Sequence, residues 1–391
     1  MEDRLSRLFN EFDRGKLSRR HLLQLLGAAA VAAPIGAYAQ GSCGGDKVGT
    51  PQCSTKPMPP PFEPTGWKTV LLDHFTLQVV DLQREAAYYN ALMSWKVRSN
   101  DGSTIVMDIG NIGSVIMKGG LVVPPPAAPP APPADGARGA APGGDAAAAG
   151  GRGGGRGPRT PPRAVWNNFC FGIDPWDTKK VEAALKSRGL NPVADHNGKD
   201  FFSFHVKDPD GFDLQISNGN KKNRRTTPAM GKLDGTPPFE PTGWETKFLD
   251  HISFEVTSYK ETVAFYQALI GWIPGPDEGS LNETVIAPEI GGLLIRGQYN
   301  AFTPGAVMPT PRHAQFGHIA FGITPFDPDK VKAELEKRGL SASVDTGAIP
   351  TSPPSEKDIH TSSYKSYHTT TPNGYNLQIS DHIVAKPMIL G

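Results

Sequence analysis

The chain has 391 residues, enough for two ordinary domains and some non-globular sequence. Its 40 basic and 39 acidic residues give a net charge of +1, which excludes a nucleic-acid binder held by a strongly basic face. Three cysteines are too few for a disulfide-rich scaffold, and 44 Gly with 38 Pro predict long irregular segments. Beyond the N-terminus no apolar run is long enough for a spanning helix, so we expect no stable membrane span.

The N-terminus has the features of an export signal. A twin arginine at 19–20 precedes a short apolar run at 22–33, and an Ala-x-Ala pattern ends at Ala39. This order is typical of a removable signal, whereas a spanning helix needs about 20 apolar residues. The segment resembles a twin-arginine translocation signal. The resemblance implies that 1–39 is a signal peptide recognised by the twin-arginine export machinery, cleaved near Ala39, and that the mature protein is periplasmic or secreted. The alternative is an uncleaved amphipathic anchor.

An internal repeat organises the rest of the chain. The segment 61–67 recurs letter for letter at 238–244, and Leu-Gln-Ile-Ser at 214–217 recurs at 377–380. Repetition on this scale predicts two homologous domains. The predicted divisions are a linker at 40–60, domain 1 at 61–220, a linker at 221–237, domain 2 at 238–385 and a tail at 386–391. Within domain 1, residues 121–164 are so rich in Pro, Gly and Ala that we expect a low-complexity insertion without a core.

Domain 1 itself divides into two halves with the same order of elements. We expect a strand, a helix and then short strands in each half. In the first half these are a strand at 71–80, a helix at 82–93 capped by Asp81, and strands at 104–109 and 114–118. In the second half they are a strand at 168–173, a helix capped by Asp177 and ending at Gly189, and strands at 201–206 and 212–217 around an Asp-Pro-Asp-Gly turn at 208–211.

Domain 2 repeats this order with further helix signals. Ser258 and Glu261 have the spacing of a capping box, which predicts a helix start. Asp327 followed by Pro328 places proline at the first position of another helix, which we expect to end at Gly339. The sequence therefore predicts an α+β fold of tandem βαβββ modules, paired into two domains.

The paired modules, the histidines on the opening strands and the turn before the last strand resemble the vicinal oxygen chelate superfamily. This superfamily contains glyoxalase I, extradiol dioxygenases and bleomycin-resistance proteins, and the resemblance covers 61–385. It implies two glyoxalase-like domains whose mixed sheets form cups, with a divalent metal at the base of a cup. It implies no single activity, because unrelated chemistries share the fold.

The resemblance implies a metal site in domain 2. Its ligands would be His251 on the first strand, His318 opening the fifth strand, and Gln378 where the superfamily usually has Glu. The fourth position, which we expect at Ile295, is apolar. Two imidazoles and one amide oxygen leave open positions on one divalent metal, whether Fe, Mn, Zn or Ni. Glu255 lies on the same strand face as His251, and we expect that it supplies the missing carboxylate.

Domain 1 has a poorer ligand set. His74 and Gln215 occupy the matching positions, but Asn168 replaces the second histidine and Met117 fills the fourth place. One imidazole with two amides is a weak set for a transition metal. We therefore expect domain 1 to be structural or to shape the substrate site.

Two more histidines of domain 2 are candidate catalytic groups. His360 precedes the last two strands and resembles a histidine near the metal of extradiol dioxygenases, and His368 lies where those enzymes usually have Tyr. Imidazole transfers protons near neutral pH, so we expect acid–base roles for both. Domain 1 has His205 in the position of His368.

The resulting prediction is an exported metalloenzyme that acts on a small substrate with vicinal oxygens. Its chemistry would be that of an extradiol dioxygenase or of a glyoxalase-type lyase or isomerase. The alternative is a non-catalytic small-molecule-binding protein of the bleomycin-resistance type, which the missing carboxylate favours. The substrate, the metal and the oligomeric state stay open at this point.

Overall fold

The computed structural model describes residues 58–122, 164–196, 200–219, 227–277, 282–287, 290–299, 312, 314–347 and 358–381. The predicted signal peptide, the tail and nearly all of the low-complexity insertion lie outside these described residues. In the described part of the chain, no helix has both the length and the apolar character needed to span a membrane.

Domain 1 forms one eight-stranded sheet from two βαβββ modules. The first module comprises β1 (Lys68–Val79), α3 (Leu82–Met93), β2 (Lys96–Asn100), β3 (Thr104–Ile109) and β4 (Gly113–Lys118). The second comprises β5 (Ala164–Asp174), α4 (Thr178–Ser187), β6 (Val193–Asp195), β7 (Ser203–Lys207) and β8 (Asp213–Ser217). The strand order is β2-β3-β4-β1-β5-β8-β7-β6. The opening strands β1 and β5 are therefore antiparallel neighbours at the centre, and each is parallel to the last strand of its own module.

Domain 2 repeats this topology. Its first module comprises β9 (Glu245–Ser258), α6 (Tyr259–Ile270), β10 (Ile273–Asp277), β11 (Asn282–Ala287) and β12 (Gly291–Tyr299). Its second comprises β13 (Ala314–Thr324), α7 (Pro328–Lys337), β14 (Ser343–Asp345), α8 (Asp358–Thr361), β15 (Ser366–Thr370) and β16 (Asn376–Asp381). The order β10-β11-β12-β9-β13-β16-β15-β14 matches that of domain 1 element for element. The predicted α+β fold of paired modules is confirmed.

Most of the predicted helix boundaries are confirmed, and one capping motif is wrong. Asp81, Asp177 and Asp327 each accept a hydrogen bond from a backbone N–H of the first helical turn. Ser258 precedes α6, but its side chain makes no capping hydrogen bond. The Glu261 carboxylate, which the capping box would turn back towards Ser258, instead pairs with Arg312.

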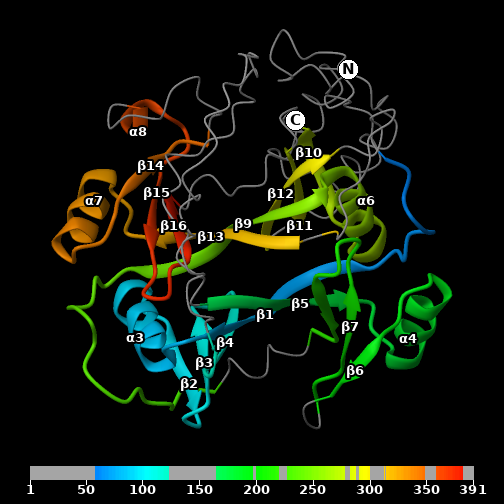
Figure 1. Ribbon diagram of the computed structural model, residues 1–391, viewed down its shortest axis with the longest axis horizontal. Coiled ribbons are helices and arrows are strands. Elements are labelled where there is room, and N and C mark those ends of the chain that lie inside the picture. Colours follow the sequence, from blue (N-terminus) through cyan, green and yellow to red (C-terminus); the bar gives the residue numbers. More distant parts are fainter. Residues whose placement is uncertain are drawn as a thin grey trace, which may run out of the picture.

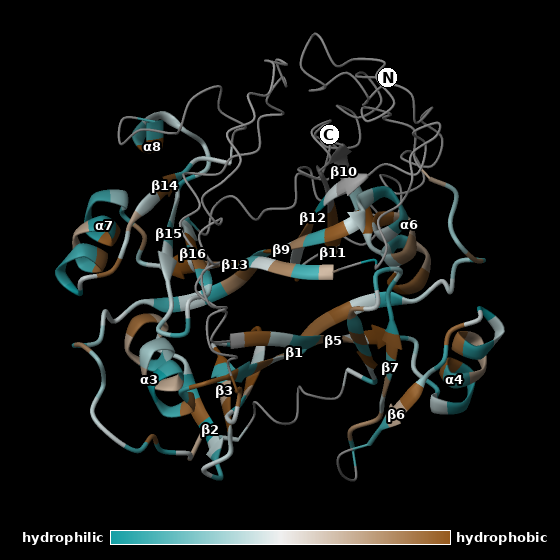
Figure 2. Cartoon of the chain, in the orientation of Figure 1, coloured by the Kyte–Doolittle hydropathy of each residue, from teal (hydrophilic) through white to brown (hydrophobic). Residues whose placement is uncertain are grey.

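A single hydrophobic core joins the two sheets. On β1 the side chains of Phe75, Leu77 and Val79 are fully buried, and they alternate with residues that face away from this core. Aromatic rings cross between the domains, with Trp166 stacked on Phe316 at a centroid distance of 3.7 Å. Figure 2 shows the hydrophobic residues concentrated on the strands. Burial between the sheets therefore leaves the opposite face of each sheet for polar groups.

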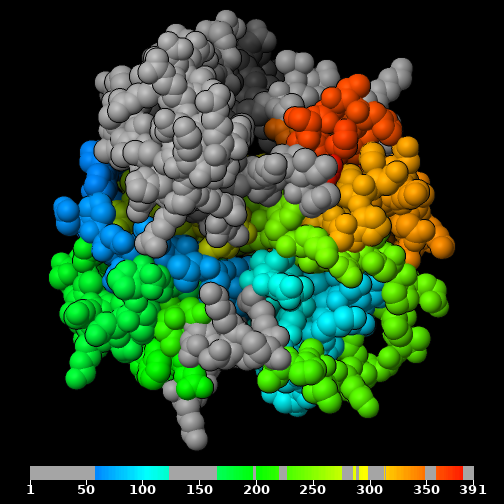
Figure 3. Space-filling model, turned by 180° about the vertical axis from the view of Figure 1, so that it is seen from behind, coloured from blue at the N-terminus to red at the C-terminus, as the bar shows by residue number. Residues whose placement is uncertain are grey.

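The contacts between the domains are reciprocal. Figure 1 shows the central strands of the two sheets stacked, with α3 and α7 on one side and α4 and α6 on the other. Trp95 of domain 1 donates to Thr246 of domain 2 at 2.9 Å, and Trp272 of domain 2 donates to Thr69 of domain 1 at 2.7 Å. The chain between the domains also packs along domain 1, as Figure 3 shows from behind, and Gly231 donates there to a backbone carbonyl of β2. The two domains therefore pack as one body.

Candidate metal-binding site

The polar face of the domain 2 sheet brings three predicted ligands onto neighbouring strands. His251 on β9 is in register with Ala320 on β13, and Ala320 is in register with Gln378 on β16. A register shift between Phe316 and His318 marks a bulge in β13 next to this group. From His318 to Ala320 the pairing with β9 is regular, with His318 opposite Ser253 and Ala320 opposite His251. Because side chains alternate across a strand, His318 lies on the same face as His251 and Gln378.

The two imidazoles meet through their Nε2 atoms. The distance from His251 Nε2 to His318 Nε2 is 2.9 Å, and the ring planes are inclined at 77°. The amide oxygen of Gln378 is buried without a hydrogen-bond partner, and it faces His318 closely enough to favour the protonated form of that ring. Two ring nitrogens and an unsatisfied oxygen therefore converge on one place.

A hydrogen-bonded chain behind these groups holds them in position. Asp250 Oδ1 lies 3.6 Å from His251 Nδ1, and the Tyr364 hydroxyl donates to the other Asp250 oxygen at 2.7 Å. The Gln378 amide nitrogen donates to the Tyr364 hydroxyl at 3.0 Å and to Ser366 at 2.7 Å. A carboxylate on Nδ1 turns the Nε2 lone pair of His251 inward, which is the usual outer arrangement of a metal-bound histidine.

His368 lies on the same face, beside the histidine pair. Its ring is 4.9 Å from that of His318, centroid to centroid, in an edge-on arrangement. Its Nε2 lies 2.9 Å from an Asp345 carboxylate oxygen, and its Nδ1 lies 2.9 Å from the side-chain oxygen of Asn376. Both ring nitrogens therefore face acceptors. This fixes the ring plane and leaves the ring able to carry a proton on each nitrogen.

Burial keeps His318 neutral. It lowers the pKa of this ring well below the usual value, and the neighbouring side chains of His251, His368 and Arg296 lower the pKa further. For Asp250, burial opposes ionisation, but the contacts with His251, Tyr364 and Ser380 outweigh burial and lower the pKa. A neutral imidazole can offer a ring nitrogen to a metal.

The structure does not bring the other two candidates to this group. Glu255 is exposed, and four residues of extended strand separate it from His251 by about 13 Å between Cα atoms. His360 lies on α8, where its Nε2 pairs with Asp329 of α7 at 3.3 Å, and its side chain is 49% exposed. The carboxylate and proton-transfer roles expected for these two residues stay predictions without a supporting contact.

The fourth ligand position was expected at Ile295, but the structure places the neighbouring Leu294 on the face that carries His251. Ile295 is paired with Phe254 and is buried in the core. Leu294 is instead paired with Ser253, on the face that carries His251. Because side chains alternate across a strand, a slip of one residue changes the face. The position is still apolar, so the expected set of two imidazoles and one amide is unchanged.

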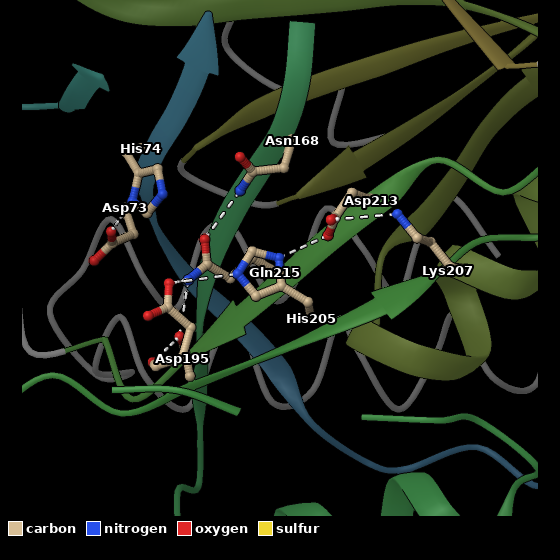
Figure 4. Close-up of polar contacts among 9 residues, drawn as sticks. Asp73, His74, Asn168, Asp195, His205, Lys207, Asp213 and Gln215 are labelled. Carbon is tan, nitrogen blue, oxygen red and sulfur yellow. Dashed lines mark hydrogen bonds and ion pairs between the residues drawn. The ribbon is translucent and has the colours of Figure 1, made fainter. Parts of the chain in front are cut away.

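Domain 1 has a closed polar network at the matching place (Figure 4). Asn168 donates to the Gln215 carbonyl oxygen at 2.9 Å, and the Gln215 nitrogen donates to Ser203 at 2.8 Å. His205 contacts Asp213 and Asp195, and these contacts together raise its pKa although burial, the largest cause, acts in the opposite direction. Every polar atom of the Gln215 amide is thus engaged, so this amide has no oxygen to offer.

A second group in domain 1 was missed by the sequence reasoning. Ligand atoms of Asp73, His74 and Cys170 lie within 4.8 Å of one another, and all three residues are buried. The available signal was the repeated Asp-His pair, since Asp73-His74 recurs as Asp250-His251.

No protein-family model matches the chain, and no curated protein matches its sequence. Solved structures with a similar arrangement include the Mn(II)-bound glyoxalase from Novosphingobium aromaticivorans, with 12% identity, 81% of this chain and 83% of that chain covered, and a TM-score of 0.49. The 2,3-dioxygenase LapB from Pseudomonas sp. KL28 is 10% identical, and the match covers 80% of this chain and 92% of that chain with a TM-score of 0.49. A variant of homoprotocatechuate 2,3-dioxygenase from Brevibacterium fuscum is 14% identical, and the match covers 84% of this chain and 74% of that chain with a TM-score of 0.48. At these identities and TM-scores the likeness assigns no activity to the chain.

Proposed function

We propose that domain 2 binds one divalent metal through His251, His318 and Gln378, and that the chain is an enzyme acting on a small substrate with two adjacent oxygens. The observation that carries this proposal is the contrast between matched amides. The Gln215 oxygen of domain 1 accepts from Asn168, whereas the buried Gln378 oxygen of domain 2 has no such amide donor and faces the His318 ring, next to the facing His251 imidazole. An unsatisfied buried oxygen is costly unless a ligand compensates it.

The donor geometry fits a metal ion. Two nitrogens, each about 2.1 Å from one ion, lie about 3.0 Å from each other at an octahedral angle of about 90° and about 3.4 Å from each other at a tetrahedral angle. The observed separation of the Nε2 atoms is 2.9 Å. Two imidazoles and one oxygen on one side of an ion leave its other positions open, as in the sites that bind oxygen or a chelating substrate. When bound, the metal would act as a Lewis acid towards the substrate's paired oxygens.

The residues around these ligands would orient the site and hold a proton near it. The chain from Gln378 through Tyr364 to Asp250 holds both the amide and the His251 ring. His368, held between Asp345 and Asn376 with both ring nitrogens facing acceptors, would keep a proton beside the ligands. Arg296 adds positive charge to the same surroundings, which favours a substrate in its anionic form.

The test is the metal content of the mature protein, purified without chelator or metal-affinity resin. Replacing His318 by Asn gives domain 2 the residue that domain 1 carries as Asn168, so we expect folding to be retained and one metal per chain to be lost. The matched control is His205→Asn, which removes an imidazole from the corresponding face of domain 1. Equal metal content in His318→Asn and wild type, after anaerobic supply of Fe(II), Mn(II), Zn(II) or Ni(II), contradicts the proposal.

A non-catalytic binding protein is the second candidate, and one observation favours it. None of the three converging groups is a carboxylate, so the site has one negative charge fewer than a site of two histidines and one carboxylate. If a protein without metal binds an aromatic ligand, and His318→Asn leaves that affinity unchanged, this candidate replaces the first. We also propose export through the twin-arginine pathway, supported by Arg19, Arg20 and the short apolar run after them.

A further inference from the structure

We infer that the site of domain 2 takes a substrate that carries a carboxylate in addition to its two adjacent oxygens, and that Arg296 binds this carboxylate. The inference rests on the proposed function, because it names the class of substrate for the same site. Arg296 lies on β12, next to the strand that carries His251. Its place on the sheet, its buried Nε group and the charges around it support this assignment.

Arg296 lies on the sheet face that carries the candidate ligands. Gly292 of β12 is in register with His251 of β9, and Arg296 follows four residues later on the same strand. Ile295 is fully buried in the core, so its neighbour Arg296 faces the opposite side of the sheet. The guanidinium group is also close enough to His318 to lower the pKa of that ring. The charge of Arg296 therefore acts at the place where the candidate ligands meet.

The separation between Arg296 and the candidate ligands suits a small organic molecule. His318 is in register with Ser253 and Arg296 with Glu255, and these two partners are two residues apart on β9. Strands about 4.8 Å apart and a rise of about 3.4 Å per residue put the Cα atoms of His318 and Arg296 about 12 Å from each other. The long arginine side chain covers part of this distance. The remaining space fits a molecule with its paired oxygens near His318 and its carboxylate at Arg296.

The Nε group of Arg296 is buried and has no hydrogen-bond partner among the described residues. Glu255 lies opposite Arg296 in register, but its side chain is exposed and does not supply the acceptor. A buried N–H group without an acceptor is costly, and more so when the donor is charged. A carboxylate that accepts two parallel hydrogen bonds from a guanidinium group would satisfy Nε and a terminal nitrogen together.

Domain 1 has a different cation at the matching place. Ser114 of β4 is in register with His74, and Lys118 follows four residues later, as Arg296 follows the partner of His251 in domain 2. Lys118 is exposed. A lysine ammonium group is a flexible and strongly hydrated charge, whereas a guanidinium group presents its donors in a fixed plane that matches a carboxylate. The domain with the converging ligands is therefore also the domain with the partly buried arginine.

The charges of the site favour the same class of substrate. The three candidate ligands are two imidazoles and an amide, so they would compensate none of the charge of a divalent ion, and Arg296 adds another positive charge. The nearby carboxylates of Asp250 and Asp345 contact His251 and His368 behind the ligands. A substrate that brings a carboxylate as well as a chelating pair of oxygens supplies negative charge that the ligands lack.

The test is the binding of matched acids and amides to the full chain, measured by titration calorimetry without oxygen. The probes are protocatechuate and dihydrocaffeate, which are catechols with a carboxylate at two different distances from the ring, and the neutral amide of each. Because an acid and its amide share the ring and both hydroxyl groups, the comparison isolates the charge. Arg296→Gln removes the guanidinium group, and Lys118→Gln is the matched control in domain 1. Circular dichroism and metal content check that each variant is folded and loaded.

We expect wild type and Lys118→Gln to bind at least one acid about 10–100-fold more tightly than its amide. Arg296→Gln should bind the acid and the amide of that pair about equally, with the affinity for the amide unchanged. The inference is overturned if wild type prefers neither acid, if the preference persists in Arg296→Gln, or if Lys118→Gln loses it to the same extent.

Failure of the proposed function has a different signature, because a metal bound to the paired oxygens strengthens the binding of acid and amide alike. If only the metal proposal is wrong, His318→Asn has the metal content of wild type and binds every probe as wild type does, with the preference for the acid retained. If only the carboxylate inference is wrong, His318→Asn loses the metal and its affinity for acids and amides, while wild type shows no preference between them.

Discussion

The stability of the interface between the domains should fall as the pH rises, because one buried carboxyl group is held protonated. Asp208 lies in the β7–β8 turn of domain 1 and is 5% exposed. Burial raises its pKa from 3.8 to about 7, since the two backbone N–H groups that bind its Oδ1 offset only part of the desolvation. The charge of Asp210 raises the pKa further. Tyr266 of domain 2 packs against this carboxyl group.

The sign and size of this pH dependence follow from the difference in proton binding between the folded and unfolded chain. The unfolded chain releases this proton near pH 3.8 and the folded chain near pH 7, so between these values the folded state binds more protons. The contribution to the free energy of unfolding is complete below pH 3.8 and is lost as the pH passes 7. A shift of about three units corresponds to about 4 kcal/mol in total, of which about 2–3 kcal/mol is lost between pH 5 and pH 8.

The substitution Asp208→Asn tests this pH dependence. Its side-chain amide keeps an oxygen acceptor for both backbone N–H groups, but it has no carboxyl proton to release. Domain 2 has Thr371 and Asn373 in its matching turn, so this turn forms without a carboxylate at either place. Urea unfolding followed by tryptophan fluorescence at pH 5 and pH 8 measures the free energy of each protein. Between pH 5 and pH 8, the free energy of unfolding of wild type should fall by about 2–3 kcal/mol relative to that of Asp208→Asn.

The matched control is Asp101→Asn. Asp101 is exposed, and hydrogen bonds from Ser103 and Thr104 lower its pKa, so it is ionised throughout the range from pH 5 to pH 8. Its replacement should therefore leave the pH dependence of stability equal to that of wild type. Parallel curves for wild type and Asp208→Asn would refute the reasoning, as would a wild type that gains stability relative to Asp208→Asn as the pH rises.

Three further outcomes are expected. Tyr364→Phe should lower the metal affinity of domain 2 by about 10–100-fold in equilibrium dialysis without loss of folding, because its hydroxyl supports Asp250 and Gln378 and domain 1 already has Phe at this place. Trp272→Phe should destabilise the protein by about 1–2 kcal/mol in urea unfolding, because it removes the buried hydrogen bond to Thr69 across the interface; an unchanged midpoint would contradict this. Leu335→Ala should cost about 2–5 kcal/mol in the same assay, since this side chain of α7 is fully buried; a loss below about 1 kcal/mol would mean that the helix is loosely packed.

Much of the architecture could be read from the order of residues. The repeat of 61–67 at 238–244 implied two like domains, and the strand–helix–strand order in each half implied paired modules. Both inferences depend on local patterns, namely alternation, caps and turn residues, which lie within a few positions of each other. The same is true of Asp81 as a cap, since it bonds to a backbone group only three residues away.

Which side chains meet was decided by tertiary structure. The sequence placed His251, His318 and Gln378 on separate strands, and only the sheet register brings them to one face. Ile295 was misplaced because one step of register changes the face of a strand. Cys170 and His74 are far apart in the chain, and no local pattern marks them as neighbours. Their meeting depends on the antiparallel pairing of β1 with β5, which joins two segments that are distant in the chain.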